Sequence, residues 1–69
     1  MMIELGRYRH FKGNVYEVIA IAKHSETEED MVVYKPLDGD QGIWVRPLSM
    51  WSEIITRDGK TFPRFEKID

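Results

Sequence analysis

Two histidines and several carboxylates are the side chains of this sequence that could do acid–base or metal chemistry. His24, Ser25 and Glu26 match the His-x-Glu pattern of zinc deaminases, in which the glutamate moves protons beside the zinc. Those enzymes also need cysteine ligands, and the chain contains no cysteine, so this chemistry is excluded. A cysteine-free site would require His10 to approach His24 and a carboxylate, and no spacing here forces that. We expect no metal, and a solvated turn in which Ser25 or Thr27 makes local hydrogen bonds.

Other motifs of catalytic or ligand-binding loops are missing or incomplete. The sequence has neither of the glycine-rich patterns that cradle phosphates, and no serine stands at a recognisable nucleophile elbow. Residues 38–42 (DGDQG) lack the further ligands and the closing glutamate of a calcium loop, so they predict a plain turn. We expect no cofactor. An enzyme with His10 or His24 as base and Glu26 as its orienting carboxylate ranks behind two binding functions.

An aromatic ring beside arginines is the pattern that most favours a binding function. If Ile43 and Val45 face the core, strand alternation places Trp44 and Arg46 together on the outer face. Arg64 could join Arg46 in a small cationic group. An indole supplies stacking area and a guanidinium supplies directional donors, a combination common on binding surfaces. The structural alternative is that Arg46 covers the Trp44 ring and pairs with a loop carboxylate.

A period of two in the hydrophobic pattern predicts strands. The longest, Val15–His24, has apolar residues on both faces, as in a strand that bends and buries different faces along its length. Glycine turns and Asp58-Gly59 are typical of hairpins, whereas Pro63 predicts an edge or a bulge. The expected strands are Arg7–Phe11, Val15–His24, Met31–Leu37, Ile43–Arg46, Ile54–Arg57 and Lys60–Phe65. Between them, a single helical turn near residues 47–52 can place Met50, Trp51 and Ile54 under the sheet.

These elements predict an all-β fold: a small SH3-like, partly open barrel of five or six short antiparallel strands with one helical turn. An OB-type barrel is the alternative, although it normally needs more residues. The chain has 69 residues, of which 42% are hydrophobic and 12% aromatic, which indicates one domain over residues 1–69.

Composition also limits which classes of partner and which cellular compartment are expected. The formal net charge of −2 offers little attraction to phosphates or anionic membranes. No apolar run reaches the roughly 20 residues needed to span a bilayer, so no membrane partner is expected. The lack of cysteine is typical of the reducing cytoplasm.

The combined motifs resemble a family of small bacterial proteins described only as a domain of unknown function. Its pattern runs Gly-x-Tyr-x-His-x-Lys-Gly, His-Ser-Glu-Thr, Val-Val-Tyr, Trp-Val-Arg-Pro and Pro-Arg-Phe, and this chain matches it over nearly its whole length. At Trp51 the family has a Phe-type aromatic, which leaves a packing role intact. The resemblance implies a compact β-rich fold and no established activity. It gathers one set of candidate ligand-binding residues, which are His10, His24, Glu26, Tyr34, Trp44, Arg46 and Arg64.

We therefore predict a binding or adaptor module that presents Trp44, Arg46 and Arg64 to a peptide or protein partner. The alternative is nucleotide or single-stranded nucleic-acid binding, with Trp44 and Tyr34 as stacking platforms. Edge strands also invite pairing between copies, and Trp51 or Phe62 could be exposed, so the sequence is compatible with a monomer or a homodimer.

Overall fold

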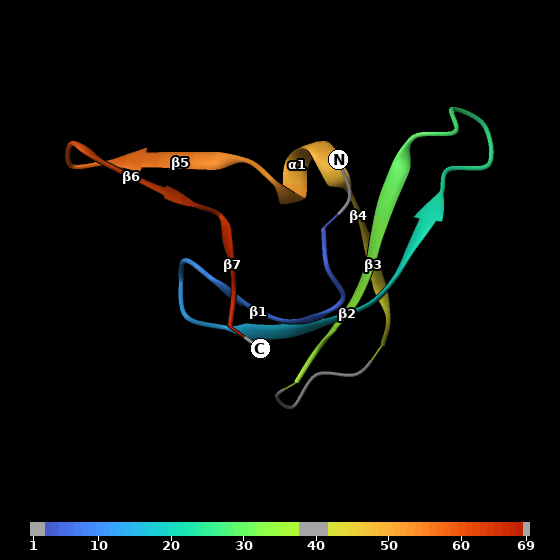
Figure 1. Cartoon of the computed structure of the whole chain (residues 1–69), viewed down its shortest axis with the longest axis horizontal. Coiled ribbons are helices and arrows are strands. Elements are labelled where there is room, and N and C mark those ends of the chain that lie inside the picture. Colours follow the sequence, from blue (N-terminus) through green and yellow to red (C-terminus); the bar gives the residue numbers. More distant parts are fainter. Residues whose placement is uncertain (1–2, 38–41, 69) are drawn as a thin grey trace.

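The structure is a computed structural model that describes residues 3–37 and 42–68, and it consists mostly of β-strands (Figure 1). The elements are β1 (Gly6–His10), β2 (Val15–Lys23), β3 (Asp30–Pro36), β4 (Trp44–Pro47), α1 (Leu48–Trp51), β5 (Ile54–Arg57), β6 (Lys60–Pro63) and β7 (Phe65–Lys67). The first five predicted strands begin and end within one residue of the observed ones. The turn predicted over residues 38–42 lies outside the described residues except for Gly42.

The strands form one antiparallel sheet of five strands and one separate hairpin. The sheet order is β4-β3-β2-β1-β7, and β5 pairs with β6. The described chain thus has seven strands rather than the expected five or six, because the segment predicted as one last strand bends at Arg64 and divides into β6 and β7. Pro63 ends β6 and has no N–H to continue the ladder. Since β4 and β7 do not pair with each other, the described strands do not close into a barrel.

A bulge in β2 gives the sheet its bend. The pairing with β3 shifts between Val18 and Ala20, which leaves Ile19 more than one-third exposed. Val18 lies opposite Tyr34 before the shift, and Ile21 lies opposite Val32 after it. Directly paired residues of antiparallel strands share a face, so the bulge keeps apolar side chains of both halves of β2 on the inner face. The predicted change of buried positions along this long strand is confirmed.

The core lies on the inner face of the sheet and is dominated by aromatic rings. Its buried members are Tyr8, Val18, Val32, Tyr34, Trp51 and Phe65. Trp51, which is 2% exposed, comes from α1 and stacks on Phe65 with ring centroids 3.7 Å apart. Its neighbour Met50 points in another direction from the same helical turn, and Ile54 begins β5, so both are about half exposed. Among the described residues, no helix is long and apolar enough to cross a membrane.

The β5–β6 hairpin projects away from the five-stranded sheet (Figure 1). Its turn has positive φ at Asp58 (52°) and Gly59 (75°), as the predicted Asp-Gly hairpin requires. One backbone hydrogen bond closes the base of the hairpin, and a second ties this base to the end of β1. The Arg64 N–H donates to the Glu53 carbonyl, and the Phe11 N–H donates to the Arg64 carbonyl, each at 2.9 Å.

Candidate functional site

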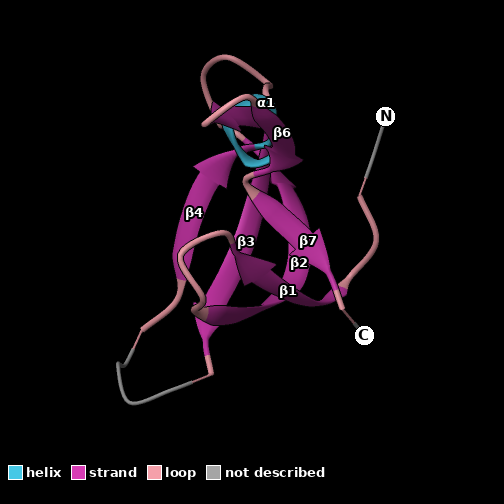
Figure 2. Cartoon of the chain, turned by 90° about the vertical axis from the view of Figure 1, so that its left-hand side faces the viewer, coloured by secondary structure: helices cyan, strands magenta, loops and turns pink. Residues whose placement is uncertain are grey.

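The inner face of the sheet carries charged side chains as well as the core. Arg46 is paired with Val32, and Trp44 is paired with Tyr34, so both β4 side chains share the face of those buried residues. Val45 points to the outer face and is 59% exposed. The expectation that Ile43 and Val45 would face the core is therefore wrong for β4. β4 is an edge strand of the sheet (Figure 2), and both Trp44 and Val45, on its opposite faces, are at least half exposed.

Phe65 is the ring on which two predicted site residues meet. His10 is its cross-strand partner in β1, with ring centroids 4.9 Å apart in an edge-to-face arrangement. The guanidinium carbon of Arg46 lies 5.5 Å from the Phe65 centroid, within range of a cation–π interaction. Nε of Arg46 is buried and has no hydrogen-bond partner among the described residues.

A second ring, Phe11, extends this arrangement toward the β5–β6 hairpin. It lies against His10 with centroids 4.6 Å apart. The cationic ends of Arg57, Lys12 and Arg64 lie 5.0, 5.9 and 6.0 Å from its centroid. We call the whole set the aromatic–cation surface, and its members are His10, Phe11, Lys12, Arg46, Arg57, Arg64 and Phe65.

The cations of the aromatic–cation surface differ in whether a carboxylate neutralises their charge. Arg64 donates from Nε and Nη2 to the same Glu53 carboxylate oxygen, with the Nε bond at 3.1 Å, so its charge is already paired. For Arg46, by contrast, no carboxylate partner is found among residues 3–37 and 42–68. Lys12 and Arg57 also have no carboxylate partner in the described part of the chain. Arg46 differs from these two in that its Nε is buried.

The Arg46 guanidinium lies over the Phe65 ring. In the alternative in which Arg46 covers Trp44 and pairs with a loop carboxylate, the loop residues Asp38 and Asp40 lie outside the described residues.

The surroundings of His10 favour its neutral form. Its Nδ1 accepts a hydrogen bond from the backbone N–H of Lys12 at 3.1 Å, so the ring proton is on Nε2. Burial lowers the pKa of His10 below its ordinary 6.5, and the positive charges of Arg64, Arg46 and Lys12 lower it further. An anion placed among these cations would oppose their effect on the imidazole.

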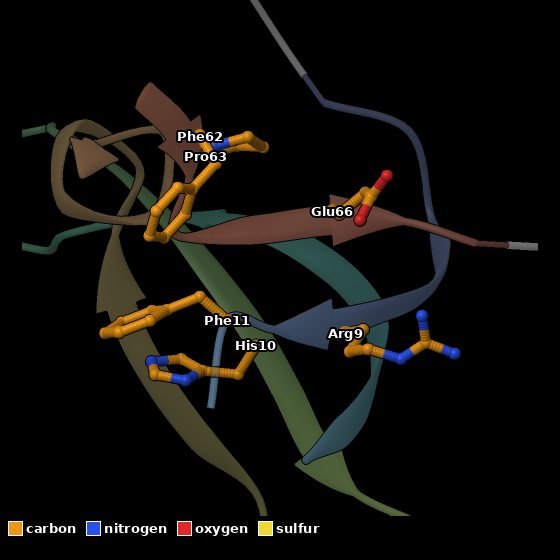
Figure 3. Close-up of a pocket in the computed structure, with 6 residues that line it drawn as sticks. All are labelled: Arg9, His10, Phe11, Phe62, Pro63 and Glu66. Carbon is orange, nitrogen blue, oxygen red and sulfur yellow. The ribbon is translucent and has the colours of Figure 1, made fainter. Parts of the chain in front are cut away.

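A pocket of about 340 Å³ opens beside this surface, between the end of β1 and the chain around β6 and β7 (Figure 3). His10 and Phe11 form one wall, and Phe62 approaches them from β6. The Phe62 ring is 5.7 Å from that of Phe11. Arg9 and Glu66, which are cross-strand partners, border the pocket farther along β1 and β7. The pocket is apolar next to the His10 ring and charged at its border.

The remaining predicted site residues do not join this group. His24 and Glu26 belong to the β2–β3 turn, where Nδ1 of His24 accepts hydrogen bonds from the backbone N–H groups of Glu26 and Thr27 at 3.1 and 3.3 Å. That turn and the β1–β2 turn after His10 lie at opposite ends of β2 (Figure 1). Tyr34 is buried in the core at 8% exposure, whereas Trp44 is 50% exposed.

The expected local role of the turn residues is confirmed. Oγ1 of Thr27 accepts from the Glu29 N–H at 3.2 Å. Within the described part of the chain, no group of three or more potential metal ligands is found.

Four members of the surface were missed as site residues in the sequence. Phe65 was noted only as part of the Pro-Arg-Phe motif, and the others are Phe11, Lys12 and Arg57. Phe11 and Lys12 follow directly after β1 and begin the Gly13 turn, while Arg57 ends β5 just before Asp58-Gly59. The signal that could have found them is an aromatic or basic residue directly flanking a predicted hairpin turn. Their meeting depends on the hydrogen bond between Phe11 and Arg64, which alternation within single strands does not predict.

Comparison with known proteins agrees with this architecture and leaves the activity open. Residues 6–67 match the family described as "Protein of unknown function (DUF1653)". The chain is also similar to a DUF1653 protein from Bordetella bronchiseptica of known crystal structure, with 34% identity and a TM-score of 0.86 over 96% of this chain and 87% of that one. No curated protein matches the chain. With a family match over almost all of its length, the chain belongs to the DUF1653 family.

Proposed function

We propose that this protein is a binding module whose aromatic–cation surface recognises an acidic segment of a peptide or protein partner. The observation that carries the proposal is Arg46, a cation packed on Phe65 with no carboxylate partner among the described residues. A carboxylate would supply the missing acceptor, and charge-assisted hydrogen bonds of this kind are about twice as strong as neutral ones. The pocket beside His10 could take an apolar side chain of the same segment.

The sheet, the helical turn and the hairpin would then act as an SH3-like, partly open barrel, a class of fold that binds peptides in aromatic-lined grooves. Nucleotide or single-stranded nucleic-acid binding is the second candidate, because the half-exposed Trp44 ring could stack on a base. Its other expected platform, Tyr34, is buried, and the net charge of −2 does not favour a phosphate backbone. The acidic peptide is therefore preferred.

The test is a ¹⁵N–¹H shift titration with three probes at low and high salt. The first is a panel of short blocked peptides containing glutamate and tyrosine, the second is the same panel with glutamine for glutamate, and the third is a mixed-sequence single-stranded RNA. We expect the acidic panel alone to shift resonances of His10, Arg46 and Phe65. Shifts with RNA that fade as salt rises would favour the alternative, and no shift with acidic peptides at millimolar concentration would overturn the proposal.

Arg46→Met is the variant that separates binding from folding. Methionine can keep the packing over Phe65 while removing the charge and the buried, unpartnered Nε. Lys35→Met is the matched control, because Lys35 is exposed on the opposite face of neighbouring β3. We expect Arg46→Met to weaken binding about tenfold or more, as for loss of a charged hydrogen bond, with stability retained. Equal weakening by both variants would indicate a general charge effect instead of a site.

A further inference from the structure

The two edges of the five-stranded sheet are built differently. At one edge, β7 exposes the charged residues Glu66 and Lys67, the kind of side chain that protects an edge against further pairing. The other edge, β4, has Trp44 at 50% and Val45 at 59% exposure, and Ile43 directly before it at 64%. Its outer side pairs with no other strand among the described residues. In Figure 2 no strand lies beyond β4.

Such an edge presents backbone donors and acceptors together with apolar side chains. Edges of this kind are used for strand addition, in which main-chain hydrogen bonds hold a peptide and alternate side chains select it. On β4 the selecting side chains of the inner face are Trp44 and Arg46, with Val45 between them on the outer face. Pro47 ends the strand and offers no N–H, so the addition is confined to a few residues.

We infer that β4 takes an extended acidic peptide as an added antiparallel strand, which rests on the binding function proposed above. Every pairing in this protein is antiparallel among the strands described. In that direction the peptide reads acid–apolar–aromatic: a carboxylate opposite Arg46, an apolar residue opposite Val45 and a ring opposite Trp44. Opposite-charge and aromatic cross-strand pairs are among those that stabilise antiparallel sheets.

Repulsion between like charges makes a second copy of the chain a less favourable partner for β4 than an acidic peptide. Two copies paired along β4 would each bring Arg46 and the cations around Phe11 to the same side of the joined sheet. That arrangement adds like charge, whereas an acidic strand neutralises Arg46. The inferred partner is therefore a peptide segment with a carboxylate two residues before an aromatic ring.

The experiment uses a blocked probe peptide with the central sequence Glu-Val-Tyr, and two versions of it that carry a single backbone N-methyl group on Val or on Tyr. In an added strand, successive N–H groups point alternately toward and away from the neighbouring strand. We expect one N-methyl version to bind at least tenfold more weakly and the other to bind within about threefold of the probe. The reversed sequence Tyr-Val-Glu should bind at least several-fold more weakly.

Hydrogen exchange on the whole protein gives a second measurement on the β4 side. The probe should slow exchange of backbone amides within residues 44–46, and Lys35→Met should leave this protection unchanged. If the probe binds but both N-methyl versions bind equally well, strand addition is wrong while the proposed acidic-peptide function stands. If no acidic peptide binds, the proposed function itself fails. If amides of β4 become protected with rising protein concentration alone, the occupant is a second copy and the inference is overturned.

Discussion

Replacing Trp51 tests whether the single helical turn closes the core. A buried aromatic side chain removes about 150–250 Å² from water, which corresponds to about 4–6 kcal/mol at ~25 cal/mol per Å². Trp51 is 2% exposed and contacts the rings of Tyr8, Tyr34 and Phe65. Substitutions of this type typically cost about 3–5 kcal/mol. A domain of 69 residues has about 3.5–10 kcal/mol in total, so Trp51→Ala should remove about a third of the stability or more.

Trp51→Phe is the matched control because it separates ring packing from the indole N–H. Nε1 of Trp51 is buried without a hydrogen-bond partner among the described residues, a situation that costs about 1–3 kcal/mol. Phenylalanine can retain the stacking on Phe65 and relieves that cost, which offsets its smaller buried area. We expect Trp51→Phe to change the unfolding free energy by no more than about 1.5 kcal/mol, although its ring is smaller.

Urea unfolding, followed by far-ultraviolet circular dichroism and by tryptophan fluorescence, measures both changes. With a slope of about 1 kcal/mol per molar urea for a small domain, Trp51→Ala should lower the midpoint by about 3 M or unfold the protein in buffer. If Trp51→Ala stays within about 1 kcal/mol of the parent, α1 does not close the core. If Trp51→Phe costs as much as Trp51→Ala, the indole N–H is a stabilising donor and our account of Nε1 is wrong.

Two further predictions concern pH and the hairpin. The pKa of His10 is lowered in the folded state, so its contribution to stability is full above the unfolded value of about 6.5 and is lost as pH falls below it. The Tm should decrease between pH 7.5 and pH 5, and this decrease should be smaller in His10→Gln than in the parent protein. An equal decrease in the Tm of both proteins would contradict this prediction. At Gly59, where φ is +75° with no atom within 4 Å of an added Cβ, Gly59→Ala should cost about 1 kcal/mol from backbone conformation alone. Gly59→Asn should cost less, and urea midpoints that rank the two variants in the opposite order would refute the turn geometry.

Much of the fold could be predicted from local signals in the sequence. Alternation over Val15–His24 and the glycine turns determine the bounds of the first five predicted strands to within one residue, because each strand must bury one face and each turn needs positive φ. The division of the last strand at Arg64 was harder to predict. Pro63 marked an irregular position, but the passage of the chain from the hairpin to the sheet depends on the pairing of β7 with β1, a contact between distant parts of the sequence.

The candidate site was predicted only in part, for a physical reason visible in β4. Val45 is more apolar than Arg46, and a polarity rule therefore directs Val45 inward. At the sheet margin the opposite arrangement occurs, since the guanidinium of Arg46 lies over the Phe65 ring while Val45 is 59% exposed. His10, Arg46 and Arg64 come from three distant segments. His10 lies beside β7 because β1 pairs with β7, whereas Arg46 comes from β4 at the opposite edge and reaches Phe65 of β7 on the inner face.

The surroundings of Arg46 also indicate why this position is occupied by an arginine. Its Nε is buried without an acceptor among the described residues, which by itself opposes folding by about 1–3 kcal/mol. A methionine could pack over Phe65 without that cost. Stability alone therefore does not account for this residue, and in a domain of this size the cost is a substantial fraction of the total. An acidic ligand that accepts hydrogen bonds from the guanidinium would account for it, because the charge that is unfavourable in the isolated fold becomes favourable in the complex.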